Sequence, residues 1–149
     1  MTFSGRSFDP TRDQSSASGP LVDYSLARRA VLAAVRRGSL GTSEVCDAHP
    51  ELMRAAKNIG EDLPDPCPVC SHDTLRSVRY VYGEELKRNS GRVVYPAEWL
   101  KELTREHDQF TCYVVEVCVD CSWNHLVRSY QAGRRFVPNG TRPERRERG

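Results

Sequence analysis

Four cysteines carry the strongest chemical signal in this sequence. They form two Cys-x-x-Cys pairs, Cys67 with Cys70 and Cys118 with Cys121, separated by forty-seven residues. Two such pairs supply four thiolates, which complete the tetrahedral shell of a structural zinc ion. The tight turn between two cysteines at this spacing directs both sulfurs at one point, and its backbone N–H groups can stabilise the charge on sulfur. We therefore predict one structural Zn²⁺ held by Cys67, Cys70, Cys118 and Cys121.

The same thiolates could instead form a redox dithiol, disulfides or an iron–sulfur cluster. The sequence argues against the first two and leaves the third open. A redox dithiol normally lies at a helix N-terminus, which lowers the thiolate pKa, whereas strand-like sequence follows both pairs here. Disulfide pairing of all six cysteines is unexpected in the cytosol, where thiols stay reduced. An iron–sulfur cluster would use the same four thiolates, so iron stays open as an alternative to zinc.

The remaining cysteines and two nearby histidines are weaker candidates. Cys112 precedes Cys118 by six residues on one predicted strand, about 20 Å away, so it should not reach the same metal. Cys46 lies in a helical segment, where a small buried cysteine is the expected role. His72 and His125 follow the two pairs closely. Because four cysteines already fill the shell, we predict surface or strand positions for both, with His72 the better placed to touch the site.

Catalytic signatures are missing from the sequence. It contains no G-x-S-x-G, no phosphate-binding loop, no Gly-rich dinucleotide fingerprint and no H-E-x-x-H. A shell of four thiolates also leaves no open position for water or substrate, so the metal would not act as a Lewis acid. We therefore expect a non-catalytic protein, with an enzyme whose site is unrecognised as an alternative.

The composition describes a polar chain with an uneven charge distribution. The chain has 149 residues, 38% of them hydrophobic, and a formal net charge of +2. Seven arginines and two glutamates give the segment 122–149 a charge of +5, while the preceding body is close to neutral. No apolar stretch is long enough to cross a membrane, and the N-terminal residues lack the apolar segment of a secretory signal. We therefore expect a cytoplasmic protein.

The elements that must position the cysteines follow from the hydrophobic periodicity. Alternating apolar residues predict strands at 74–82, 110–119 and 123–130, and Pro96 suits the first turn of a helix between the first two. The fold class predicted is α+β, with a zinc-ribbon-like antiparallel sheet. The predicted order is a disordered leader at 1–20, a helical unit at 21–60, a linker at 61–66, a zinc ribbon with a helical insertion at 67–132, and a disordered Arg-rich tail at 133–149.

Basic side chains mark the candidate binding surface. The pattern helix, short helix, helix between residues 23 and 60 is compatible with a DNA-reading helix-turn-helix and equally with an ordinary helical packing unit. The tail could reach phosphates or an acidic protein surface, or simply be solvated. The candidate residues are Arg29, Arg36, Arg37, Arg54, Lys57, Arg134, Arg135, Arg142, Arg145, Arg146 and Arg148.

Several segments resemble a known family. The stretches EVCDAHPELMRAAKNIG, CPVC, YVYGEEL and VVEVCVDCSWNHLVRSY are similar to small actinobacterial proteins that share a domain of unknown function. The resemblance covers roughly residues 20–132, and Val114 to Tyr130 is its most specific part. The resemblance implies the same metal site formed by two cysteine pairs. It does not extend to the predicted leader or to the predicted tail.

These observations predict a binding protein. A zinc ribbon commonly presents a strand edge or loop to RNA polymerase, the ribosome or nucleic acid, so we predict an accessory factor of transcription or translation with such a macromolecular partner. Sequence-specific DNA binding through residues 23–60 is the alternative. No small-molecule substrate is indicated.

Overall fold

A computed structural model describes residues 18–137 of the chain. Most of the predicted leader and tail, residues 1–17 and 138–149, therefore lie outside the described residues. The elements in chain order are β2 (Ser18–Asp23), α2 (Ser25–Arg37), α3 (Thr42–Val45), α4 (Pro50–Ile59), β3 (Glu61–Asp62), β4 (Leu75–Tyr82), η2 (Glu84–Asn89), β5 (Arg92–Val93), α5 (Glu98–Glu106), β6 (Phe110–Cys118), β7 (Asn124–Ala132) and η3 (Arg134–Phe136).

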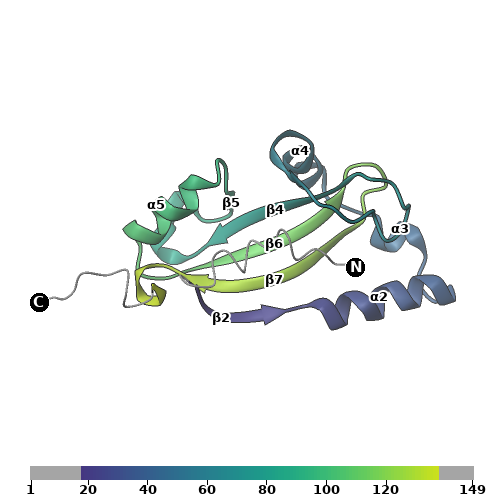
Figure 1. Ribbon diagram of the computed structural model, residues 1–149, viewed down its shortest axis with the longest axis horizontal. Coiled ribbons are helices and arrows are strands. Elements are labelled where there is room, and N and C mark those ends of the chain that lie inside the picture. The colour runs from purple at the N-terminus through teal and green to yellow at the C-terminus, as the bar shows by residue number, and fades with distance from the viewer. Residues whose placement is uncertain (1–17, 138–149) are drawn as a thin grey trace, which may run out of the picture. The chain divides into compact units, whose positions relative to one another are not determined.

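The fold is α+β, as predicted. Six strands form one sheet in the order β2-β7-β6-β4-β3, with β5 also pairing with β4 (Figure 1). Both short strands run antiparallel to β4, with Glu61 opposite Ser77 and Tyr80 opposite Val93. The long strands β4, β6 and β7 coincide within two residues with the three that the alternating pattern predicts.

The chain divides into two compact units at positions that sequence analysis does not predict. Within the described residues, the first unit comprises 23–79 and 113–128, and the second comprises 18–22, 80–112 and 129–137. The boundary passes through β4, β6 and β7 instead of through residues 61–66. Part of that predicted linker is strand, since Glu61–Asp62 form β3.

The first unit joins three helices to both cysteine pairs. The helix α2 ends at Gly38, whose φ of 82° is a left-handed conformation that glycine adopts without steric cost. Pro50 occupies the first turn of α4, where its missing N–H is harmless. Leu32 of α2 and Val45 of α3 share one buried core with Cys67, Leu75, Cys118 and Trp123. The helical segment is therefore part of the same core as the cysteines.

The second unit has its own buried side chains and includes residues that we expected in the tail. Its fully buried apolar residues include Val81, Leu100, Leu103, Phe110 and Tyr130. The prediction of disorder from residue 133 is wrong for the first residues of that range. Arg134–Phe136 form η3, and Arg134 pairs with Asp108 at 2.8 Å. The prediction of disorder from 1 to 20 likewise fails at Ser18–Pro20, which belong to β2.

Among residues 18–137, none of the helices has both the length and the apolar character needed to cross a membrane.

Candidate metal centre

The structure brings the two cysteine pairs together. Cys67 and Cys70 lie in the loop before β4, Cys118 ends β6, and Cys121 lies in the turn to β7. The Sγ atoms of Cys67 and Cys121 are 3.7 Å apart, as are those of Cys70 and Cys118, and all four lie within 4.8 Å of one another. Two segments separated by forty-seven residues thus place four thiols around one point.

The spacing of these sulfurs fits a tetrahedral metal. A tetrahedron of thiolates with a metal–sulfur bond of about 2.3 Å has edges of about 3.8 Å. The two sulfur–sulfur separations of 3.7 Å match that edge. Four cysteine thiolates are also the ligand set that selects Zn²⁺ or iron over hard cations. The four residues therefore fit the predicted metal.

Both cysteine pairs have the same local backbone. In the first pair, the N–H groups of Val69 and Cys70 donate to Cys67 Sγ at 3.4 and 3.5 Å. In the second, the N–H groups of Asp120 and Cys121 donate to Cys118 Sγ at 3.4 and 3.3 Å.

Each turn closes in the same way. Ser71 and Ser122 have φ values of 70° and 74°, and their N–H groups donate to the carbonyls of Cys67 and Cys118. Two backbone N–H groups therefore point at each of the sulfurs of Cys67 and Cys118, and these dipoles stabilise the thiolate charge.

The surroundings of the cysteines shift their thiol pKa values in different directions. Burial alone would raise the pKa of Cys118, but hydrogen bonds from the Thr74 hydroxyl and from two backbone N–H groups lower it to about 7. Burial raises the pKa of Cys67 and of Cys121. A bound cation would favour the thiolate form of all four, because it supplies the positive charge that the core lacks.

A fifth cysteine lies beside this cluster. Cys46 directly follows the last residue of α3, and its Sγ is 3.6 Å from Cys121 Sγ. Its loop is fixed to the second cysteine pair, since Ala48 N–H donates to the Ser122 carbonyl at 3.1 Å and Asn124 donates to Asp47 at 3.0 Å. Sequence analysis assigned Cys46 only a packing role and missed this proximity. Its position after a short helix is not a signal that could have revealed it.

Three other candidates, Cys112, His72 and His125, are not part of the four-thiol cluster. Cys112 is fully buried in the second unit, and it is not among the four clustered thiols, as predicted. His72 is exposed and pairs with Asp120, and together with Cys70 these two side chains make a small group of potential ligands next to the main cluster. His125 stacks on Trp123 with ring centres 5.8 Å apart.

A family model matches residues 16–147, and its description is a family of unknown function, DUF5318. The chain belongs to this family. Relatives include the uncharacterized protein Mb0050 of Mycobacterium bovis and the uncharacterized protein Rv0049 of Mycobacterium tuberculosis. Each is 46% identical over 128 residues, which cover 86% of this chain and 88% of the relative. The resemblance to an actinobacterial family is therefore confirmed. No solved structure matches the chain.

A buried carboxylate holds α2 to the sheet of this DUF5318 member. Glu116 on β6 is 6% exposed, and its Oε2 accepts hydrogen bonds from Arg28 Nε and Trp123 Nε1, both at 2.7 Å. No local pattern in the sequence indicates this triad, because Arg28 and Glu116 are 88 positions apart. Its role is structural, since Trp123 and Leu32 belong to the core around the cysteines.

The predicted binding residues are dispersed over the DUF5318 chain. Arg29, Arg36 and Arg37 are exposed on α2, and Arg54 and Lys57 are exposed on α4. Arg134 and Arg135 differ from these, because they bind Asp108 and Gln109 within the second unit. The other four predicted residues, Arg142, Arg145, Arg146 and Arg148, lie outside the described residues.

Proposed function

We propose that this protein binds one structural Zn²⁺ through Cys67, Cys70, Cys118 and Cys121 and acts as a non-catalytic binding module. The observation that carries the proposal is the four-thiol cluster, whose sulfur–sulfur separations of 3.7 Å match a tetrahedral zinc shell. Four thiolates fill that shell, so zinc would contribute to folding and would not bind substrate.

The surroundings of the cluster support a structural role. Cys67 and Cys118 are 1% and 0% exposed and lie in the core that α2, α3 and β4 share. Zinc would therefore connect the loop before β4 to the turn after β6 at the core to which α2 and α3 contribute Leu32 and Val45. In a chain of this size, such a link supplies folding free energy that a small core lacks.

Elemental analysis of the full chain tests the metal. We expect one zinc per chain in the wild type and in Cys112→Ser, which removes a thiol outside the cluster. Cys70→Ser should lose the zinc. Absence of zinc and iron from the wild type would refute the proposal, whereas iron with visible thiolate-to-iron absorption would assign the same four ligands to a different metal.

For the partner, we propose the transcription or translation machinery, with RNA polymerase, the ribosome or nucleic acid as the contacted surface. The exposed arginines of α2, Arg29, Arg36 and Arg37, support an acidic or phosphate-bearing partner. The use of zinc ribbons in these assemblies supports it by analogy of fold.

Affinity purification from a mycobacterial lysate tests this assignment. The wild type should recover polymerase or ribosomal subunits, and the triple variant R29Q/R36Q/R37Q should recover at least about five-fold less, because each lost charge weakens electrostatic association. The single variant Lys101→Gln, which changes an exposed charge on α5, is the matched control. Recovery of neither assembly by the wild type would reject the assignment.

Direct DNA binding is the second candidate. The helices α2, α3 and α4 form where the helix-turn-helix pattern predicts them, and Arg54 and Lys57 are both exposed on α4. This function predicts binding that weakens steeply with salt and falls further in R54Q/K57Q. Affinity for duplex DNA that the double substitution leaves unchanged would exclude α4 as a reading helix.

A further inference from the structure

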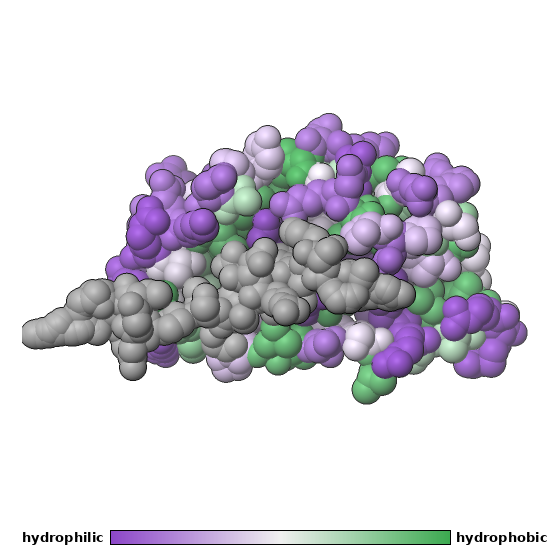
Figure 2. Space-filling model, in the orientation of Figure 1, coloured by the Kyte–Doolittle hydropathy of each residue, from purple (hydrophilic) through white to green (hydrophobic). Residues whose placement is uncertain are grey.

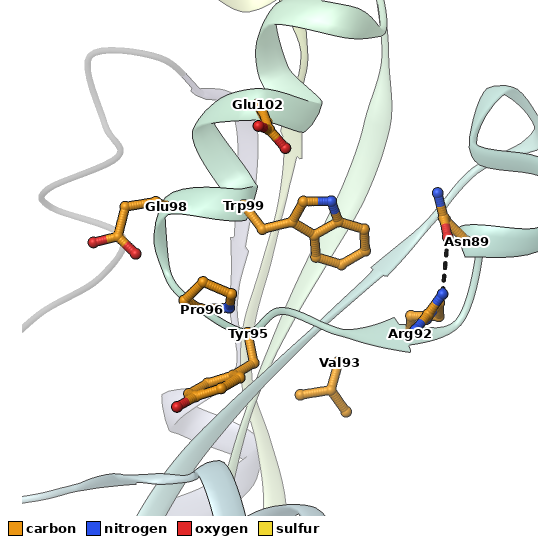
Figure 3. A pocket seen from close by; sticks show the side chains of 8 residues that line it. All are labelled: Asn89, Arg92, Val93, Tyr95, Pro96, Glu98, Trp99 and Glu102. Carbon is orange, nitrogen blue, oxygen red and sulfur yellow. Dashed lines mark hydrogen bonds between the residues drawn. The ribbon is translucent and has the colours of Figure 1, made fainter.

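A hollow in the second unit, lined by none of the cysteines, has a composition suited to binding. It has a volume of about 410 Å³ and lies between the end of η2, the strand β5 and the first turns of α5 (Figure 3). This volume falls within the range of small-ligand sites. The residues that determine its chemistry are Asn89, Arg92, Tyr95, Glu98, Trp99 and Glu102.

Aromatic side chains form one part of the hollow. The Trp99 side chain is half-buried and projects into the middle of the view in Figure 3. Tyr95, which also lines the hollow, is 62% exposed. Both rings therefore offer a flat apolar surface to a molecule that enters the hollow.

Two carboxylates also line the hollow; in Figure 3 that of Glu102 lies near the Trp99 indole, and that of Glu98 projects away from it. Glu98 and Glu102 are one helical turn apart on α5, and within residues 18–137 neither has a hydrogen bond or an ion pair. Like charges at this spacing destabilise a helix. The hydrophilic character of α5 is also visible on the molecular surface (Figure 2). A bound cation would relieve the repulsion between the two side chains.

Among the charged residues that line the hollow, two carboxylates outnumber a single guanidinium, that of Arg92. The guanidinium of Arg92 donates to Asn89 Oδ1 at 3.2 Å, and in Figure 3 this pair lies on the opposite side of Trp99 from Glu98. At the start of α5, the N–H groups of Trp99 and Leu100 donate to the carbonyls of Pro96 and Ala97. The first turn of α5 therefore has no free N–H at these two positions for an anion, and the charge of the hollow favours a cation.

We propose that this hollow binds the guanidinium group of an arginine side chain presented by a peptide. A planar guanidinium can stack on the indole of Trp99 while its N–H groups donate to the carboxylate of Glu102, and the negative charge of Glu98 adds to the attraction. An ammonium group has no plane to stack and no paired donors, so lysine should bind more weakly. This site is independent of the metal proposed for the first unit.

Tryptophan fluorescence gives a direct measurement, since the chain has two tryptophans and Trp123 is fully buried. The probes are three peptides of the form acetyl-Gly-X-Gly-amide, with X as arginine, citrulline or lysine. The arginine peptide should shift the emission of the full-length wild type. Citrulline has the same shape without the charge, and its affinity should be about ten-fold or more lower.

Substitutions of acidic and of basic residues in the hollow should change the affinity for the arginine peptide in opposite directions. E98Q/E102Q should weaken the arginine peptide at least about ten-fold, whereas Glu106→Gln, an exposed α5 carboxylate outside the hollow, should change it less than about two-fold. Arg92→Gln should tighten binding about two- to three-fold, because it removes the competing positive charge. Thermal unfolding of each variant checks that α5 stays folded.

Three results would overturn the proposal: no emission change with the arginine peptide, equal affinity for arginine and citrulline, or binding that E98Q/E102Q leaves unchanged. Equal affinity for arginine and lysine would remove the guanidinium assignment. Because none of these measurements depends on zinc content, failure here is distinguishable from failure of the metal proposal.

Discussion

Single residues decide the chemistry of this protein through contacts that span most of the chain. Four thiols from two tight turns lie around one point, and a fifth, that of Cys46, lies beside one of them, the thiol of Cys121. Among the four cysteines of the two turns, Cys67 and Cys118 accept backbone N–H hydrogen bonds, and the sulfur–sulfur separations suit a tetrahedral metal. Cys46 is close to one sulfur, that of Cys121, without completing the tetrahedron.

This difference predicts unequal effects of two serine substitutions. Cys121→Ser should abolish zinc binding and lower the free energy of unfolding by about 4 kcal/mol or more, since a structural metal contributes directly to folding. Cys46→Ser should keep one zinc per chain and cost about 1 kcal/mol. Metal content and urea unfolding measure both. Loss of zinc from Cys46→Ser would make Cys46 a ligand.

The buried carboxylate of Glu116 gives a second prediction at this scale. Glu116→Gln keeps an oxygen for Trp123 but removes the charge that Arg28 binds, so we expect a loss of about 2 kcal/mol. The exposed carboxylate of Glu51 provides the control, because Glu51→Gln should change stability by less than about 0.5 kcal/mol. Urea unfolding followed by far-ultraviolet circular dichroism distinguishes the two. Equal stability of both variants would show that the triad contributes nothing.

At the scale of elements, local sequence signals placed most boundaries correctly. The strands follow alternating apolar residues, and α4 begins at a proline and ends at a glycine. Three elements depart from the prediction: β2, which begins within the predicted leader, and the short strand β3 and the helix η3, which we predicted as linker and tail. The segments β3 and η3 have polar sequences that form regular structure because a neighbour supplies hydrogen bonds: β4 pairs with β3, and Asp108 binds the residues of η3.

The connection between β7 and η3 predicts a contrast between two glycines. Gly133 has a φ of 122°, and a Cβ there would lie 2.3 Å from the Asp108 carbonyl oxygen. Gly133→Ala should therefore destabilise the protein by about 3 kcal/mol or more. Gly38 also has a positive φ, but no atom lies within 4 Å of its Cβ position, so Gly38→Ala should cost about 1 kcal/mol. Thermal unfolding of the two variants tests this order, and similar losses would contradict it.

The whole molecule consists of two compact units, and the four clustered cysteines belong to one of them. Leu32, Val45 and Trp123 share the core of that unit with Cys67 and Cys118, while the second unit has buried residues of its own, such as Leu100 and Phe110. The proposed metal should therefore affect the stability of the two units unequally.

Metal removal tests this inequality. After treatment with a strong zinc chelator, amide hydrogen exchange should accelerate most at the two cysteine pairs and in α2, because their shared core loses the proposed link. Amides of α5 should accelerate less. Cys70→Ser without chelator should reproduce the pattern. Equal acceleration in both units, or none in either, would contradict a structural metal confined to the first unit.

The amino-acid sequence by itself determined the cysteine pairs, the long strands and the α+β class, because these depend on spacing and periodicity over a few residues. Tertiary structure alone decided the proximity of Cys46 to Cys121, the Arg28–Glu116–Trp123 triad and the division of the chain through its strands. The two contacts of Cys46 and Arg28 join residues 75 and 88 positions apart. Strand register and helix packing fix such pairs, and both arise from the burial of the whole core, which no local pattern of residues encodes.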